Sequence, residues 1–179
     1  MKTFCLSTMI FAVLSLCSNI IQAQTTNAKL DQVCLENNEQ FSITSKYVEG
    51  ETYVILVGLP TGYSSSQKSY PVLYVLDGDV FFGMAKEIAT WLMFNEEIKD
   101  IIVIGISFGQ GTDVWYNKRV RDLMPSSNTI FARAHNAGEA DNFLKFLQYE
   151  LFPTVSKNYR TYPDSSAISG TSLGGLLNT

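Results

Sequence analysis

A Gly-x-Ser-x-Gly pentapeptide lies near the end of the sequence, at Gly170-Thr171-Ser172-Leu173-Gly174. Between an apolar strand and an apolar helix, this spacing is typical of a nucleophile elbow, a sharp turn that points a serine hydroxyl out of a sheet. The outer glycines leave space where side chains would collide. The pattern predicts Ser172 as a nucleophile in a turn shaped by Gly170 and Gly174. The alternative is an ordinary Ser- and Gly-rich turn between a strand and a helix.

A serine nucleophile needs a base and an orienting acid, and in elbow enzymes both follow the serine in the sequence. Seven residues follow Ser172, and none of them is Asp, Glu or His. His135 is the sole histidine and precedes the serine. We interpret it as an exposed loop residue, although a triad is decided by geometry rather than order, which leaves an intact enzyme using His135 as an alternative. We therefore expect the triad acid and histidine to lie outside this chain.

The residues near Ser172 also indicate where negative charge would be stabilised. Leu173 begins the next helix, whose N-terminus presents backbone N–H groups and the positive end of a dipole. We expect the N–H of Leu173 to be the first oxyanion donor. Upstream, Asp77-Gly78-Asp79 ends an apolar run. Two carboxylates there would suggest a metal, but no histidine or further carboxylate clusters with them in the sequence, so we expect no metal and no cofactor.

These residues need strands to position them. Alternating polarity predicts a hairpin of strands at 41–48 and 52–59. Compact apolar runs at 71–76 and 101–106 predict strands covered on both faces. A short strand at 166–169 leads into the elbow. The sequence therefore predicts an α/β fold of the α/β-hydrolase type, with a mostly parallel sheet, an N-terminal antiparallel hairpin and an incomplete C-terminal end.

Apolar residues at helical spacing predict two helices between these strands. The apolar face of the first comprises Phe81, Met84, Ala85, Ile88 and Leu92. The second spans 140–159, where Asp141 would cap the start and Pro153 would introduce a kink or begin another helix. Residues 107–138 are predicted as a long irregular stretch. It contains the cluster 118–122, which we interpret as a solvated or salt-bridged face rather than an anion site.

The N-terminal residues predict an export signal, because Lys2 precedes a mostly apolar stretch at 4–16. Cleavage at the end of 1–23 would leave a polar segment at 24–39 and an esterase-like domain at 40–179. An uncleaved anchor is the alternative, but the apolar run is short for a spanning helix. We expect an exported, periplasmic or extracellular protein with no membrane span after signal removal. The formal net charge of −4 argues against nucleic acid as a partner.

The chain resembles the esterase family of α/β-hydrolases, which includes siderophore esterases, S-formylglutathione hydrolases, carbohydrate esterases and mycolyltransferases. The matching stretches are 70–79, 121–123, 138, 141–147, 150–153, 159–160 and 170–175. Together they cover most of residues 40–177 in the family's order. Thr171 departs from the pattern, because such proteins often carry histidine there, but the nucleophile does not depend on it.

The resemblance implies that the loop after the Leu-Asp-Gly strand supplies the second oxyanion-hole N–H, from Asp79 or Gly78. It also implies a structural ion pair at Arg121-Asp122. The function expected from the sequence is that of an exported serine carboxylic-ester hydrolase for small-molecule siderophore or carbohydrate esters, present as an N-terminal portion. The alternative is a non-catalytic binding module on a degenerate hydrolase scaffold. It is disfavoured because a chain ending inside the elbow helix would leave core surface uncovered.

Overall fold

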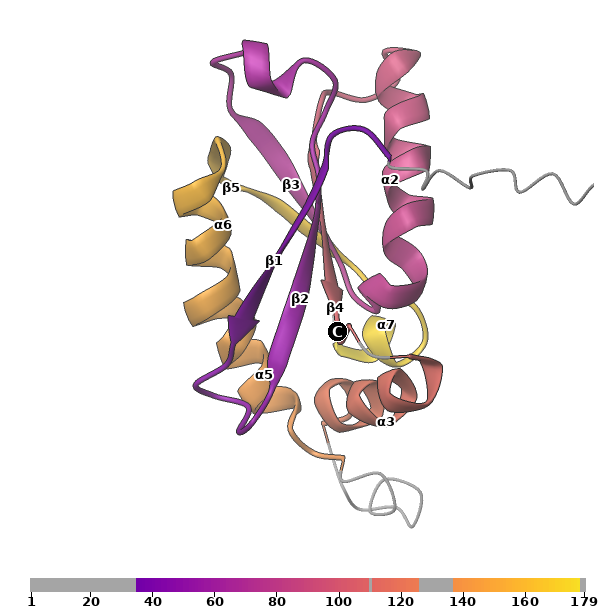
Figure 1. Ribbon diagram of the computed structural model, residues 1–179, viewed down its shortest axis with the longest axis vertical. Coiled ribbons are helices and arrows are strands. Elements are labelled where there is room, and N and C mark those ends of the chain that lie inside the picture. The colour runs from indigo at the N-terminus through magenta and orange to yellow at the C-terminus, as the bar shows by residue number, and fades with distance from the viewer. Residues whose placement is uncertain (1–34, 110, 126–136, 178–179) are drawn as a thin grey trace, which may run out of the picture. The chain divides into compact units, whose positions relative to one another are not determined.

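The computed structural model describes residues 35–109, 111–125 and 137–177 (Figure 1). Within these ranges five strands form one sheet in the order β1-β2-β4-β3-β5. Their bounds are β1 Asn38–Thr44, β2 Thr52–Gly58, β3 Tyr70–Val75, β4 Ile102–Ser107 and β5 Thr161–Ser169. β2 pairs antiparallel with β1 and β4, whereas β3 pairs parallel with β4 and β5. This confirms the predicted α/β fold with its antiparallel hairpin at one edge.

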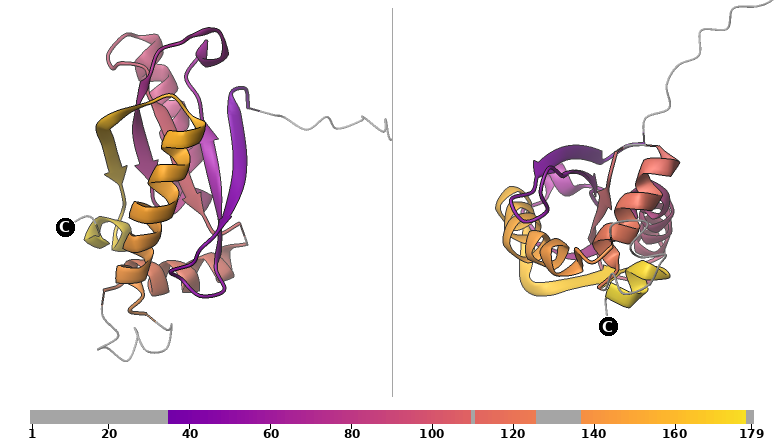
Figure 2. Two further views of the ribbon diagram at one scale, coloured as in Figure 1. Left: turned by 90° about the vertical axis from the view of Figure 1, so that its left-hand side faces the viewer. Right: turned by 90° about the horizontal axis from the view of Figure 1, so that it is seen from below.

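Helices cover both faces of the sheet (Figures 1 and 2). One face carries α2 Gly78–Phe94; the other carries a continuous helical segment. That segment comprises α5 Ala140–Phe146, the π-helical η2 Leu147–Leu151 and α6 Phe152–Asn158. A 3-10 turn, η1 Tyr63–Ser65, precedes β3. The two remaining helices, α3 Thr112–Leu123 and α7 Leu173–Leu177, lie near the end of the sheet where β4 finishes.

Strands β3 and β4 are buried because each contributes residues to two hydrophobic cores. Along β3, Val72 and Tyr74 belong to the core under α5 and α6, and Val75 belongs to the core under α2. This alternation follows from the two-residue period of a strand. All six residues of β4 are buried, as predicted for a strand covered on both faces. β5 differs, because none of its nine residues is buried and among the described residues it pairs only with β3.

One predicted feature of α2 is wrong. Met84 and Ile88 lie on the exposed side of α2, each with 54% of its surface accessible, although the spacing placed them on one apolar face with Phe81, Ala85 and Leu92. Lys86 is buried instead, and its aliphatic carbons occupy the space beside Gly58, where a Cβ would lie 2.5 Å from the lysine Cδ. The lysine stem packs like an apolar side chain, while its Nζ donates to the Thr90 hydroxyl.

The stretch predicted as irregular, 107–138, contains the helix α3. Its inward side mixes the buried apolar residues Val120 and Leu123 with charged residues, which interrupts the apolar periodicity of an ordinary amphipathic helix. The charged residues that are paired and partly buried are Lys118, Arg119, Arg121 and Asp122. At the start of α5 the N-cap residue is Glu139 rather than Asp141, and its carboxylate accepts a hydrogen bond from Asn142. The disturbance predicted at Pro153 is confirmed, since η2 ends just before the first turn of α6.

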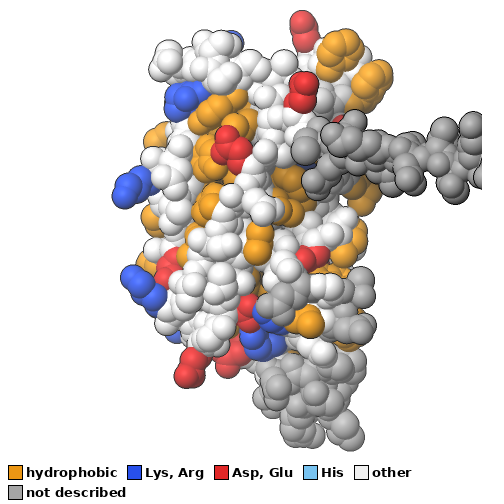
Figure 3. Space-filling view, viewed as in Figure 1, with side chains coloured by type: hydrophobic (Ala, Val, Ile, Leu, Met, Phe, Trp, Pro, Cys, Tyr) orange, Lys and Arg blue, Asp and Glu red, His pale blue; other side chains and the backbone are white. Residues whose placement is uncertain are grey.

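The first strand and the strand before the elbow differ in extent from the predictions. β1 begins and ends earlier than 41–48, and β5 is longer than 166–169. No helix of the described ranges is long and apolar enough to cross a membrane. Figure 3 shows hydrophobic side chains gathered over the C-terminal part of α2, where Trp91 and Phe94 are 64% and 77% exposed.

Candidate active site

The turn between β5 and α7 has the backbone that a nucleophile elbow requires. Ser172 lies in the left-handed region with a φ of 58°, an uncommon conformation for a residue with a side chain. Two backbone hydrogen bonds close the turn. The Thr171 carbonyl accepts the N–H of Gly174 at 3.1 Å, and the Ser172 carbonyl accepts the N–H of Leu176 at 3.0 Å. The turn therefore passes directly from strand to helix, with the serine at its most strained position.

Gly170 is the glycine on which this turn depends most directly. A Cβ on Gly170 would lie 2.4 Å from the backbone carbonyl of Gly174, which cannot move aside without opening the turn. A Cβ on Gly174 would meet the Leu76 side chain at 3.5 Å, an ordinary contact. Gly174 thus matters through the backbone that packs against Gly170, whereas Gly170 needs the absence of a side chain itself.

The two predicted oxyanion donors belong to neighbouring strand ends. Leu173 is the first residue of α7, and Gly78 and Asp79 are the first two residues of α2. The first N–H groups of a helix have no partner within the helix, so they are suited to bind an anion. The Leu76 N–H donates to the Ser169 carbonyl at 2.9 Å, which joins the end of β3 to the end of β5. Both sets of donors therefore lie at the C-terminal ends of the parallel strands.

The Asp79 side chain has a role that the sequence did not indicate. Its carboxylate accepts hydrogen bonds from the Ser107 hydroxyl at 2.8 Å and from the backbone N–H groups of Phe108 and Gly109 at 2.9 and 3.2 Å. The carboxylate therefore fastens the end of β4 to the start of α2. Within the ranges the structure describes, no group of three His, Cys, Asp or Glu side chains is placed to hold a metal ion.

Asp77 and Arg119 form a buried ion pair beside the elbow. The Arg119 Nε donates to Oδ1 of Asp77 and its Nη2 to Oδ2, both at 2.9 Å. Nη2 also reaches the Thr171 carbonyl oxygen at 3.4 Å. The guanidinium lies 5.2 Å from the centre of the Trp115 ring. Sequence reasoning assigned Arg119 to a solvated or salt-bridged face, and the salt-bridged alternative is the one found.

The other charges of α3 join the helix to β2 and the residue before it. Lys118 and Arg121 pair with Glu51, and Arg121 also pairs with Asp122, which confirms the structural ion pair. The Tyr53 hydroxyl donates to Asp122 at 2.7 Å. Burial raises the pKa of Asp122, and the bonds from Arg121 oppose that rise. Burial, reinforced by the charge of Asp122, raises the pKa of Tyr53.

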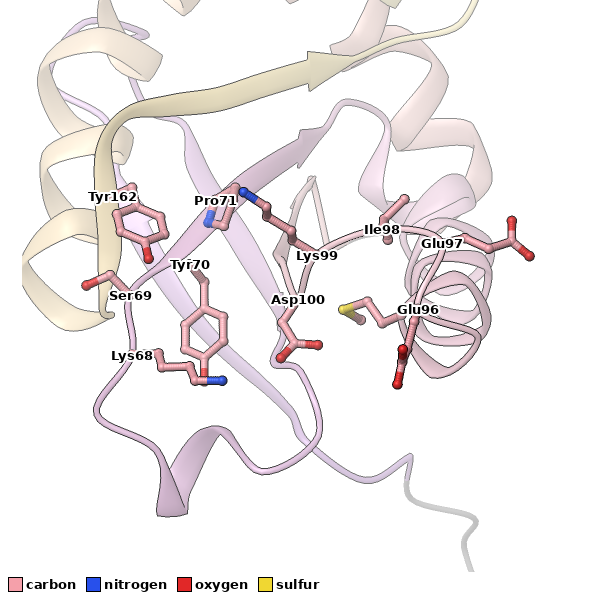
Figure 4. Close-up of a pocket in the computed structure, with 11 residues that line it drawn as sticks. Lys68, Ser69, Tyr70, Pro71, Glu96, Glu97, Ile98, Lys99, Asp100 and Tyr162 are labelled. Atoms are coloured by element: carbon pink, nitrogen blue, oxygen red, sulfur yellow. The ribbon is translucent and has the colours of Figure 1, made fainter.

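His135 lies outside the described residues, as does the predicted signal at 1–23. A cavity of about 640 Å³ lies away from Ser172, where β3 and β5 begin (Figure 4). Tyr70 and Tyr162 come from the two strands, and Asp100 follows α2. Because this cavity lies at the opposite end of the parallel strands, it does not contribute to the candidate site.

The chain matches the model of the family described as "Putative esterase" over residues 24–178. It is 27% identical to "Ferri-bacillibactin esterase BesA" of Bacillus subtilis over 139 residues, which are 72% of this chain and 47% of that protein. It is 29% identical over 151 residues to "Siderophore triacetylfusarinine C esterase" of Aspergillus fumigatus, covering 81% of this chain and 50% of that protein. The chain thus spans about half the length of these curated relatives.

The fold is also similar to that of a solved structure, the BES protein from Bacillus cereus, with a TM-score of 0.75 and 28% sequence identity. The match covers 85% of this chain and 58% of the other.

Proposed function

We propose that this chain, which belongs to the esterase family matched over residues 24–178, carries the nucleophile of an exported serine carboxylic-ester hydrolase. The observation that carries the proposal is the backbone conformation of Ser172, which has a φ of 58°. This residue lies in a close turn between a strand and a helix, which Gly170 permits because it has no side chain. Strained residues of this kind occur at active sites when the surrounding structure holds them in place. The family match supplies the type of reaction.

In the proposed reaction, the Ser172 Oγ attacks the carbonyl carbon of the ester while a histidine base takes its proton. The C=O π electrons move to the oxygen, and the resulting oxyanion accepts hydrogen bonds from the N–H of Leu173 and that of Asp79 or Gly78. The tetrahedral intermediate then collapses, and the alcohol leaves with the proton from the histidine. Water hydrolyses the acyl-serine by the same steps, which releases the acid and restores the serine.

We further propose that the histidine and its acid belong to a part of the polypeptide that corresponds to the other half of the relatives. The relatives are about twice as long as the matched region, which supports this. The reading frame downstream of Thr179 tests it directly, and we expect an Asp or Glu followed by a His. Residues 24–179 alone should hydrolyse p-nitrophenyl esters only weakly, because a serine without its base is a poor nucleophile. Robust turnover by this fragment would contradict the assignment.

For the substrate we propose an ester-linked siderophore, ahead of a carbohydrate ester. One curated relative is named a siderophore esterase and the other a ferri-bacillibactin esterase, which supports the first class. We propose export because 1–23 has the charge and length of a signal peptide. N-terminal sequencing of the secreted protein tests this; a mature protein starting near Gln24 is expected, and an intact cytoplasmic chain would contradict it.

The decisive experiment compares Ser172→Ala with Ser169→Ala in the complete product of the gene, hereafter the complete protein. Ser169 is an exposed serine at the end of β5, the strand before the turn that contains Ser172, so its variant controls for a general change in β5. We expect wild type and Ser169→Ala to hydrolyse an ester-linked ferric siderophore faster than a feruloylated or acetylated saccharide, and Ser172→Ala to lose turnover. Binding of these esters by a folded wild type without hydrolysis would favour the binding-module alternative.

A further inference from the structure

We infer that Arg119, through its ion pair with Asp77, is a positioning residue that holds the two oxyanion-donor segments of the site together. The first donor segment is the start of α7, with Ser172 and Leu173. The second is the start of α2, with Gly78 and Asp79. The inference rests on the proposed function of Ser172 and deepens it, because it states what keeps the two segments in register.

Asp77 determines how the second donor segment begins. It lies between the end of β3 and the start of α2, in the left-handed region with a φ of 53°. Its carbonyl accepts the N–H groups of Val80 and Phe81 at 2.9 and 3.0 Å, so α2 starts from this residue. The directions of the N–H groups of Gly78 and Asp79 therefore follow from the orientation of Asp77. A change in that orientation would turn the donors away from the oxyanion.

Arg119 fixes that orientation and also contacts the elbow. Its two bonds to the Asp77 carboxylate form a bidentate pair, the most directional arrangement of an ion pair. The Asp77 side chain is fully buried and that of Arg119 is 9% exposed, so water competes little for these bonds. The same guanidinium reaches the carbonyl of Thr171, the residue that precedes the nucleophile. One planar group thus touches both segments.

The elbow helix also packs on this pair. A Cβ placed on Gly174 would lie 3.6 Å from Oδ2 of Asp77, so the first turn of α7 lies against the carboxylate. Without Arg119, a buried and uncompensated negative charge would lie beside the place where an oxyanion forms. Electrostatic repulsion would then oppose the transition state in addition to any displacement of the donors.

A purely structural role for the pair predicts something different. If Arg119 only fastens α3, its replacement lowers stability without changing the kinetics of each folded molecule. Arg121 offers the matched control, because it lies on the same helix and pairs with the buried Asp122, yet its contacts lead to Glu51 rather than to the elbow. Conservative Arg→Lys changes at the two positions remove equivalent bidentate geometry and preserve the charge.

The experiment measures kcat and KM of the complete protein on the ester that wild type hydrolyses, for Arg119→Lys, Arg121→Lys and the neutral double variant Asp77→Asn/Arg119→Gln. Reaction with a fluorophosphonate titrates Ser172, so that kcat is counted per folded site and any unfolded fraction is excluded. We expect kcat to fall about 10- to 100-fold in both Arg119 variants with KM nearly unchanged, since the oxyanion contacts form only in the transition state. Arg121→Lys should keep the wild-type kcat per site.

Wild-type kcat per site in both Arg119 variants would overturn the inference, as would an equal loss in Arg121→Lys. In either case active wild type and inactive Ser172→Ala would leave the proposed function intact. A folded wild type that neither hydrolyses esters nor reacts with the fluorophosphonate would instead overturn the proposed function and the inference together.

Discussion

The helix α3 carries two sets of buried charges that face different parts of the molecule. The elbow-side pair, Asp77 and Arg119, lies between the start of α2 and the turn that contains Ser172. The hairpin-side cluster consists of Glu51, Tyr53, Lys118, Arg121 and Asp122. Both remove carboxylates from water, but they differ in the backbone they contact. One meets segments whose N–H groups would contact a reacting atom, and the other meets the N-terminal end of β2.

This difference teaches that burial and pairing do not by themselves identify a functional charge. Asp77 and Asp122 both have fully buried side chains and both accept bonds from an arginine. A buried pair contributes little net stability, because its desolvation cost offsets much of its attraction, whereas removal of one partner is costly. What distinguishes the elbow-side pair is its contact with a strained turn. Variants that affect one set and spare the other therefore test the distinction.

The largest expected effect on stability comes from Asp122→Ala. This variant leaves Arg121 and Tyr53 without their shared buried partner, so the free energy of unfolding should fall by about 3–5 kcal/mol. Chemical denaturation of the complete protein measures it. Asp141→Ala, an exposed aspartate in the first turn of α5, should change stability by less than about 0.5 kcal/mol. A drop in kcat per titrated Ser172 would show that the hairpin-side cluster also acts on the site.

Gly170→Ala should affect the elbow side most. The added methyl would meet the Gly174 carbonyl at 2.4 Å, so we expect a loss of about 1–3 kcal/mol and a lower kcat, because the turn must open. Gly83→Ala is the matched control, since a Cβ there meets nothing within 4 Å in the middle of α2. It should raise stability by roughly 0.5–1 kcal/mol and leave kcat unchanged. Wild-type turnover in Gly170→Ala would contradict the structure of the elbow.

A smaller effect is expected for Tyr53→Phe, which removes one hydrogen bond to Asp122 and should cost about 1 kcal/mol at neutral pH. Its pH dependence is more specific. The folded protein raises the pKa of Tyr53, whereas tyrosines of the unfolded chain lose their protons near pH ~10. Stability should therefore be complete below that pH and fall as the pH rises above it.

Tyr53→Phe removes the part of this loss of stability that is due to Tyr53. The decline due to Tyr74 should remain, because burial raises the pKa of Tyr74 to about 12. Urea denaturation between pH ~8 and ~11 measures the slope, which should be shallower for Tyr53→Phe. Tyr162→Phe, with the tyrosine 52% exposed, is the control and should keep the wild-type slope. Equal slopes for all three proteins would contradict the prediction.

The smallest expected effect is that of His135→Ala, which should change neither stability nor ester hydrolysis. We expect none because a base at this position would precede the serine, against the order of the fold. Steady-state kinetics of the complete protein are sufficient as the measurement. Loss of hydrolysis in this variant, with an intact fold, would restore His135 as the base and would overturn the proposal of a histidine beyond this chain.

Local patterns predicted the elements that depend on local sequence. Apolar runs predicted β3 and β4, and the pentapeptide predicted the turn now seen between β5 and α7. The same reasoning failed for α3, because its inner side mixes buried apolar residues with paired charges. It failed again at Lys86, whose burial depends on the space left by Gly58 on a distant strand. No single-segment pattern contains that information.

The sequence by itself indicated the type of chemistry that we propose, since a serine between glycines at a strand end is a short-range feature that neighbouring residues define. It also indicated the order along the chain of the five strands and of every long helix except α3. Only the tertiary structure decided which charges meet. Asp77 and Arg119 are 42 residues apart, and they pair because α3 lies near the end of the sheet where the parallel strands finish. Such pairings depend on the burial of several elements together, which is why no spacing in the sequence indicates them.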